Sequence, residues 1–290
     1  MTKLRKAMME AMLLRGFSER TKESYIQGVR GIAAYYHLSP DGLSDEQVRH
    51  YLLYLLSERK LAYSSCNLAL NAIRFLFREV LQRPRNEIYL PGTRQPQRLP
   101  EILSREEVGR ILDAATDLRH KTLLMTTYAA GLRVSELCRL RVKDIDSDRN
   151  GIRVEQGKGA KDRYTLLSPH LLRQLRLYWR TYQPDDWLFV HRNGTDPLPV
   201  GMVQKIFCRT RDQAGIRKRG GVHSLRHAFA THLLEAGVDI HTIQKLMGHR
   251  SISSTLRYFH LAQVKLLGTR SPLDLLEEAP KPKQDVPPKG

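Results

Sequence analysis

The chain has 290 residues, which is room for one large domain or two modest ones. Lys and Arg outnumber Asp and Glu by 48 to 30, giving a formal net charge of +18, and 41% of the residues are hydrophobic. Such an excess favours a polyanionic partner, with nucleic acid ahead of a membrane surface. Residues 1–90 carry 14 basic and 9 acidic residues and residues 91–290 carry 34 and 21, which excludes a basic tail on a neutral body.

Cysteine usage and hydropathy exclude further classes of protein. The three cysteines, Cys66, Cys138 and Cys208, are far apart and form no CxxC pair, so neither a disulfide framework nor a cysteine zinc site is indicated. No signal-like apolar run follows the basic start. No apolar stretch approaches the ~20 residues of a membrane span. We therefore expect a cytoplasmic, nucleoid-associated protein.

Residues 1–88 have the pattern of a small all-helical domain. Apolar residues at helical spacing predict helices over residues 18–37, 48–57 and 64–81, with Ser44 capping the second. No strand alternation occurs in this segment. Residues 89–100 contain Pro91, Pro96 and Pro100 interleaved with arginines, which predicts an extended basic linker.

A second domain is predicted over residues 101–278. Ser104 followed by Glu107 forms a capping box that opens its first helix. Alternating apolar residues on both sides of a glycine-rich turn predict a β-hairpin over residues 151–167. Further helices are expected over residues 121–130, 134–140, 169–182, 200–214, 224–236, 240–247 and 251–262. The fold class is thus mainly α with a small β-hairpin or sheet, and residues 279–290 form a Pro/Lys-rich tail expected to be disordered.

Polar residues stand at the junctions of these elements. Arg133 follows a glycine break, with Glu136 three residues later, and Lys158 stands between two glycines at the hairpin tip. His223, Arg226 and His227 open a helix, where a phosphate is naturally bound. Taken singly, these residues have ordinary interpretations: Arg133 and Glu136 as a local ion pair, Lys158 as an exposed turn residue, and the histidines and arginine as solvated helix residues.

Two more residues complete the set: His249 follows Gly248, and Tyr258 lies nine residues beyond it. A lone tyrosine on a helix is most often an ordinary half-buried side chain. In chain order, however, Gly131-Leu-Arg-Val-Ser-Glu-Leu137, Gly157-Lys-Gly159, His223-Ser-Leu-Arg-His227, Gly248-His249 and Tyr258 resemble the tyrosine recombinase (phage integrase) family. The tail Thr269–Asp274 is similar to that of integron integrases, whereas the short segment 167–200 is closer in length to Xer-type recombinases.

The resemblance implies a role for each residue. Arg133 and Arg226 grip the non-bridging oxygens of a scissile phosphate, and His223 and His249 complete the cage, with His223 helping to deprotonate the nucleophile. Lys158 protonates the leaving 5′ oxygen, and Tyr258 attacks phosphorus to give a 3′-phosphotyrosine. Glu136 and His227 support the cage. The reaction conserves the bond energy in the covalent link, so the resemblance implies no cofactor and no metal.

The resemblance also implies partners: a SAM-like core-binding domain and a catalytic domain clamp duplex DNA at specific sites. A homo-tetramer then pairs two sites and exchanges strands through a Holliday junction, with accessory DNA-binding proteins as further candidates. A zinc site among His232, His241 and His260 is rejected because no pair has a convincing ligand context. Two other functions stay open at this point: DNA relaxation by a type IB topoisomerase, and a non-catalytic DNA-binding regulator on the same fold.

Overall fold

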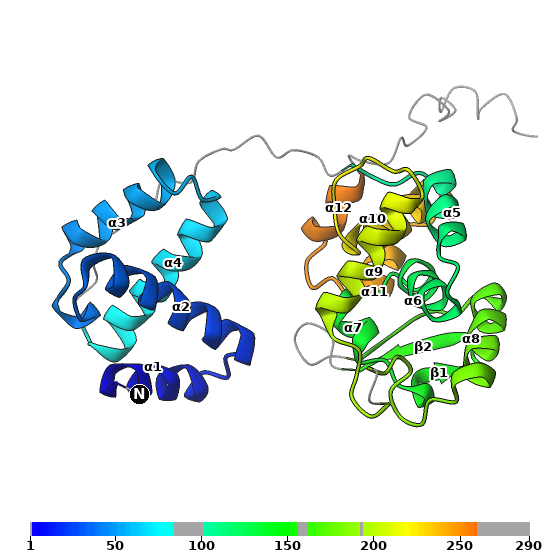
Figure 1. The fold of residues 1–290 in the computed structure, drawn as a ribbon, viewed down its shortest axis with the longest axis horizontal. Coiled ribbons are helices and arrows are strands. Elements are labelled where there is room, and N and C mark those ends of the chain that lie inside the picture. The colour runs from blue at the N-terminus through cyan, green and yellow to red at the C-terminus, as the bar shows by residue number, and fades with distance from the viewer. Residues whose placement is uncertain (1, 84–100, 156–161, 192–193, 260–290) are drawn as a thin grey trace, which may run out of the picture. The chain divides into compact units, whose positions relative to one another are not determined.

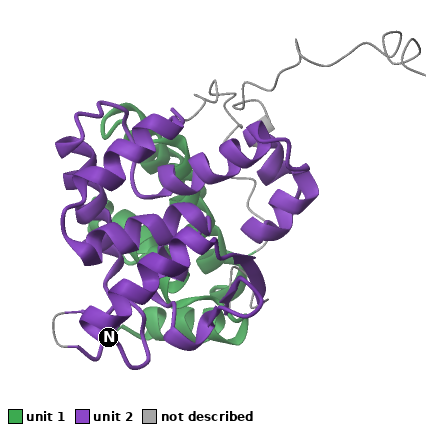
Figure 2. Cartoon of the chain, turned by 90° about the vertical axis from the view of Figure 1, so that its right-hand side faces the viewer, with its two compact units in different colours: residues 1–97 green, residues 98–290 purple. Residues whose placement is uncertain are grey.

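The computed structural model describes residues 2–83, 101–155, 162–191 and 194–259. The chain separates into two compact units, residues 1–97 and residues 98–290 (Figure 2). The domain boundaries predicted at residues 88, 100 and 278 fall outside the described ranges and stay predictions, as does the disordered tail. In the described ranges, no helix combines the length and the apolar character that crossing a membrane requires.

The secondary structure in the described residues of unit 1 is all helical (Figure 1). Its helices are α1 (Lys3–Leu14), α2 (Glu19–Tyr36), α3 (Asp45–Ser57) and α4 (Tyr63–Phe75), and α4 runs on into a π-helical turn over Leu76–Val80. Ser44 and Gln47 form a full capping box at the start of α3. Helices α2 and α4 pack closely because Gly28 brings the α2 backbone against Ala69 and Ala72. The all-helical prediction for this segment therefore holds.

Unit 2 combines helices with a small sheet (Figure 1). In its described residues the helices are α5 (Arg105–Ala114), α6 (Leu118–Ala129), α7 (Val134–Cys138), α8 (Pro169–Tyr182), α9 (Val200–Gln213), α10 (His223–Glu235), α11 (Ile240–Met247) and α12 (Ser253–Phe259). The strands, in sheet order, are β1 (Ile145–Asp146), β2 (Gly151–Val154) and β3 (Arg163–Leu166), all antiparallel. The predicted fold class is confirmed. The two-residue strand β1 was not predicted, because it is too short to show alternation.

The apolar pattern indicates the buried face of the hairpin correctly in β2, where Ile152 and Val154 are buried, but not in β3. Tyr164 and Leu166, the alternating apolar residues of β3, are 53% and 40% exposed. Arg163 and Thr165 lie on the buried face instead, opposite Val154 and Ile152 across the sheet. Their polar groups are satisfied there: the Thr165 hydroxyl donates to the Ala130 carbonyl at 2.8 Å, and Arg163 reaches a carboxylate described below.

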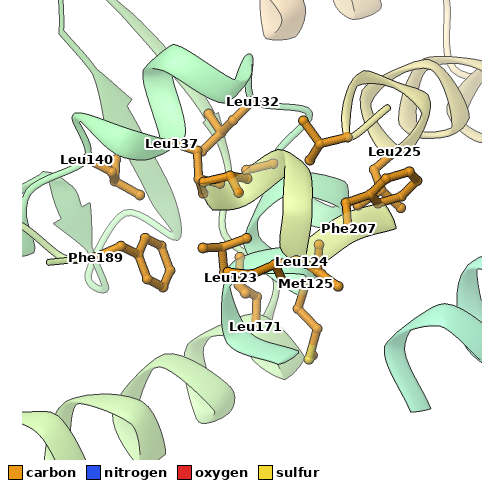
Figure 3. Close-up of a cluster of buried hydrophobic side chains, with 14 of the residues drawn as sticks. Leu123, Leu124, Met125, Leu132, Leu137, Leu140, Leu171, Phe189, Phe207 and Leu225 are labelled. Atoms are coloured by element: carbon orange, nitrogen blue, oxygen red, sulfur yellow. The ribbon is translucent and has the colours of Figure 1, made fainter. Parts of the chain in front are cut away.

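Helix α6 runs through the core of unit 2. Figure 3 shows its residues Leu123, Leu124 and Met125 among leucine and phenylalanine side chains of the surrounding elements. Each fully buried leucine stabilises the fold by about 1.5–3 kcal/mol. The threonines of α6 are buried too, but their hydroxyls donate to carbonyls one turn back, for example Thr126 to Thr122 at 2.7 Å. A helix buried on all sides gives its C-terminal end a fixed position.

Gly131 lies just past that end and lets the chain turn sharply into α7. Gly131 has φ +58°, in the left-handed region, and a Cβ there would overlap the ring of Phe229 on α10. The glycine therefore allows both the turn and the close approach of α10, which carries several of the predicted site residues.

We expect Gly131→Ala to lower the free energy of unfolding by about 2–4 kcal/mol, through backbone strain and overpacking against Phe229. Gly109→Ala is the matched control, because Gly109 lies within α5 with open space around its Cα. That change should stabilise the helix by about 0.5–1 kcal/mol. Urea unfolding of both variants checks this; equal effects of the two changes would contradict the role assigned to Gly131.

Candidate functional site

Glu136 is a buried carboxylate at the start of α7, only 8% exposed. Its oxygen Oε2 accepts from the backbone N–H of Arg133 at 2.8 Å, which caps the helix. Its other oxygen accepts from Nη1 of the Arg133 side chain at 2.6 Å. Nη2 of Arg133 donates to the carbonyl of Gly248 at 3.2 Å, at the end of α11. The carboxylate therefore fixes the position of Arg133.

A second arginine, which sequence reasoning did not select, binds the same carboxylate. Arg163 on β3 donates from Nη1 and Nη2 to both oxygens of Glu136, at 2.9 and 2.8 Å. Nη1 of Arg226 lies 3.7 Å from the carboxylate. Burial by itself raises the pKa of Glu136, but the hydrogen bonds and charges of Arg163 outweigh it and lower the pKa to about 2. Glu136 is thus ionised across the physiological range.

Arg226 is the most enclosed cation of the group, at 4% exposed. It projects from the first turns of α10 and donates to the carbonyl of Gly131 and, at 2.6 Å, to that of Met247. Burial and the neighbouring charge of Arg133 lower its pKa to about 9. Arg226 is thus still protonated at pH 7, and its two carbonyl partners fix the direction of the guanidinium.

His249 links Arg226 to the next element. Gly248 closes α11 in the left-handed conformation, with φ 60°, and so turns the chain into His249. Nη2 of Arg226 lies 3.2 Å from Nε2 of His249, and because a guanidinium only donates, Nε2 accepts. The proton therefore lies on Nδ1, which donates to the Thr255 hydroxyl at 2.9 Å. Burial, then the charge of Arg226, lowers the pKa of His249 to about 4, so the ring is neutral at pH 7.

His223 is the first residue of α10 and is exposed to solvent. Partial desolvation of its ring, followed by the charges of Arg226 and Arg133, lowers its pKa below the usual value. The ring thus lies within electrostatic range of both arginines, at the open side of the cluster.

Tyr258 on α12 lies next to this cluster and is 4% exposed. Its ring stacks on His249, with centroids 6.1 Å apart and planes 9° apart. Its hydroxyl lies 3.0 Å from Nδ1 of His227, one turn further along α10 than His223. His227 was predicted to support the cage; the structure places it directly against the phenol, a contact that no sequence signal distinguishes from the role given to His223.

The structure therefore brings together seven of the eight predicted residues and adds Arg163. Lys158 lies outside the described residues, so its predicted position is not described. Three guanidiniums surround one carboxylate, and His249 and His223 have lowered pKa values. The cluster is thus net positive and suited to an anion.

His232 is one of the histidines that the sequence offered as a zinc ligand, and His260, another, lies outside the described residues. His232 accepts or donates a 2.8 Å hydrogen bond with the Tyr128 hydroxyl, beside the core rather than in the cluster. Within the described ranges, no three His, Cys, Asp or Glu side chains gather in a way that could hold a metal ion.

Comparison with known proteins gives a family for both units. Residues 101–264 match the phage integrase family, and residues 4–87 match the phage integrase N-terminal SAM-like domain. A Sinorhizobium fredii protein that carries the name integrase/recombinase is 45% identical over 99% of this chain and 93% of its own length. The tyrosine recombinase XerA of Thermococcus onnurineus is 39% identical over 75% of this chain and 79% of its own.

A solved structure of lambda integrase, a tetramer bound to a Holliday junction, has the same fold. It aligns with a TM-score of 0.71 at 19% identity, over 88% of this chain and 76% of that one. The family match covers more than half of the chain, and the relatives align with both units. The predicted resemblance is confirmed: this chain belongs to the phage integrase family of tyrosine recombinases.

Proposed function

We propose that this site carries out the strand cleavage and rejoining of a site-specific DNA recombinase, with Tyr258 as the attacking group. The observation that carries the proposal is the stacking of the Tyr258 ring on His249, whose Nε2 accepts from the buried guanidinium of Arg226. A phenol one side chain away from a net positive, hydrogen-bonding cluster is placed to meet an anionic phosphodiester.

Arg133 and Arg226 hold the two non-bridging oxygens of the scissile phosphate. Guanidinium forks match this geometry, and their preorganised donors act most strongly on the charge that builds up in the transition state. The contacts of Arg133 with Glu136 and of Arg226 with backbone carbonyls support this, because they fix both guanidiniums before a substrate arrives. His223, at the open side, adds a hydrogen bond to a phosphate oxygen.

Before DNA binds, His249 is a neutral ring whose Nε2 accepts from Arg226 and orients that guanidinium. To donate to a phosphate oxygen, the ring takes up a proton at Nε2, which a bound anion favours, and Nη2 of Arg226 then turns from Nε2 to the phosphate. Thr255 holds the ring in either state through Nδ1.

The chemical step transfers the phosphoryl group from the 5′ oxygen of DNA to Tyr258. The phenol oxygen bonds to phosphorus, the bond from phosphorus to the 5′ oxygen breaks, and the phenol proton passes to Nδ1 of His227, 3.0 Å away. Lys158 gives a proton to the departing 5′ oxygen. Attack by a 5′ hydroxyl of the partner strand then reverses the step and joins the strands without an external energy source.

Family membership favours recombination over the two other functions that the sequence left open, DNA relaxation and non-catalytic regulation. For this chain we propose duplex DNA at specific sites as the substrate and a homo-tetramer on two paired sites as the active assembly. The net charge of +18, shared by both parts of the chain, supports a DNA-binding surface on each unit. The solved lambda integrase tetramer on a Holliday junction supports the assembly by analogy of fold.

Tyr258→Phe should abolish the denaturant-resistant adduct on a pool of nicked duplexes of randomised sequence, while DNA binding in a mobility-shift assay is retained. The reason is that the ring and its packing stay while the attacking oxygen is lost. Tyr128→Phe is the matched control, because it removes the hydroxyl of a partly buried tyrosine that is also hydrogen-bonded to a histidine in the same unit. An adduct with Tyr258→Phe would show that another residue attacks.

Arg226→Ala should slow adduct formation on an ordinary phosphodiester by about 100- to 1,000-fold, the cost of removing one oxyanion donor. On a duplex with an uncharged methylphosphonate at the scissile position, the same change should cost much less, because that group carries no charge to neutralise. Both substrates are tested with the same preparation of the variant, so any loss of folded protein lowers both rates equally and does not change their ratio. Equal slowing on both would remove Arg226 from the phosphate-binding role.

Lys158→Ala should slow cleavage of an ordinary duplex by about 100-fold or more, the usual contribution of a general acid. A duplex whose leaving group is a 5′ thiol needs little protonation, so on it the slowing should be a few-fold at most. Single-turnover rates on the two substrates check this, with Lys161→Ala, three residues further along the sequence, as the control. If the alanine at 158 slows both substrates alike, the proton comes from elsewhere.

A further inference from the structure

Arg163 is a buried cation to which the reaction above gives no role. It is the first residue of β3, opposite Val154, and it follows Lys158 by five residues in the sequence. Its side chain is 10% exposed, in a position where a charged group is stable only with full hydrogen bonding.

The contacts of Arg163 tie three elements together. Nη1 and Nη2 reach both oxygens of Glu136 on α7, and Nε donates to the carbonyl of Leu246 on α11 at 2.9 Å. The aliphatic part of the side chain packs on Gly248, where a Cβ would come within 2.8 Å of Cδ of Arg163. One side chain therefore joins the hairpin to the two segments that hold Arg133 and His249.

The carboxylate of Glu136 and a phosphodiester are both anions, and both can accept hydrogen bonds from the guanidinium groups of this site. With Arg163 present, both oxygens of Glu136 already accept a guanidinium N–H, Arg133 shares one of them, and Arg226 stays 3.7 Å away. Without Arg163, the ionised carboxylate would be left short of partners in a buried position. Arg226 is then the nearest further guanidinium, and Nη2 of Arg133 can leave the Gly248 carbonyl for the carboxylate; either movement takes donors away from a substrate.

We propose that Arg163 is a positioning residue for DNA cleavage: by donating to both oxygens of Glu136, it limits Arg133 to one side-chain hydrogen bond with the carboxylate and keeps Arg226 at 3.7 Å from it, so that both guanidiniums can hold the scissile phosphate. The inference rests on the phosphate-binding role proposed above for those two arginines. It assigns Arg163 no contact with DNA.

The test compares Arg163→Met with the double variant Glu136→Gln, Arg163→Met. Methionine removes the donors at similar length, and we expect single-turnover adduct formation at saturating protein to slow by about 100-fold, the scale of a misplacement by about 1 Å. Glutamine removes the charge that competes for the arginines but keeps an acceptor for the Arg133 N–H. The double variant should therefore form adduct at least about tenfold faster than Arg163→Met.

Arg153→Met is the matched control, because Arg153 lies on the paired strand and its ion pairs with Asp162 and Glu155 are at the surface. It should change the rate by less than about threefold. Thermal unfolding of each variant is measured alongside. If Arg163→Met does not fold, Arg163→Lys, which cannot serve both carboxylate oxygens and Leu246 together, carries the same comparison with and without Glu136→Gln.

Recovery in the double variant supports the inference, since a residue needed only for stability is not rescued by the loss of its partner. A folded Arg163→Met with the wild-type rate, or a folded double variant no faster than the single one, overturns it. The methylphosphonate result for Arg226 separates this from the proposed function. If Arg226→Ala behaves as predicted on methylphosphonate DNA but the double variant does not recover, only the role of Arg163 is wrong. If Arg226→Ala slows both substrates equally, the proposed phosphate site itself is wrong.

Discussion

The structure of unit 2 depends on one buried carboxylate surrounded by guanidiniums. Glu136 accepts from Arg133 and Arg163, with Arg226 just beyond hydrogen-bond distance, and these arginines come from α7, β3 and α10. A buried charge without partners costs several kcal/mol, so the carboxylate forces the elements that carry its partners to meet. The excess positive charge that results is a folding constraint and, for an anionic substrate, a binding site.

The same constraint explains why backbone groups matter as much as side chains here. The carbonyls of Gly131 and Met247 accept hydrogen bonds from Arg226 and orient its guanidinium. The left-handed turn at Gly248 sets the position of His249. Both glycines lie at helix ends, where carbonyls lack intrahelical partners and can accept from a guanidinium. The ends of α6 and α11 are thereby turned into fixed parts of the site.

Much of this could be predicted from the chain alone, because local signals agree with the fold. Ser104 and Glu107 predict the start of a helix, and the structure has the full capping box there. The motif order indicated the family, and comparison confirmed it. Strand β3 was harder: apolar Tyr164 and Leu166 are exposed, while Thr165 is buried and the Arg163 side chain is only 10% exposed, since that face is set by pairing with Glu136 and Ala130. Periodicity cannot reveal such a partner, which lies far away in sequence. The contact of His227 with Tyr258 was missed for the same reason.

The central claim is that one phenol oxygen becomes bonded to DNA, and the bond itself can be located. Wild-type protein is trapped on a nicked duplex, the DNA is digested with nuclease, and the protein is cut with trypsin for mass spectrometry. Cleavage after Arg257 releases a peptide that begins with Tyr258 and ends at Lys265. If Tyr258 attacks phosphorus, that peptide carries a nucleotide remnant on Tyr258. A remnant on any other residue, with this peptide unmodified, would contradict it.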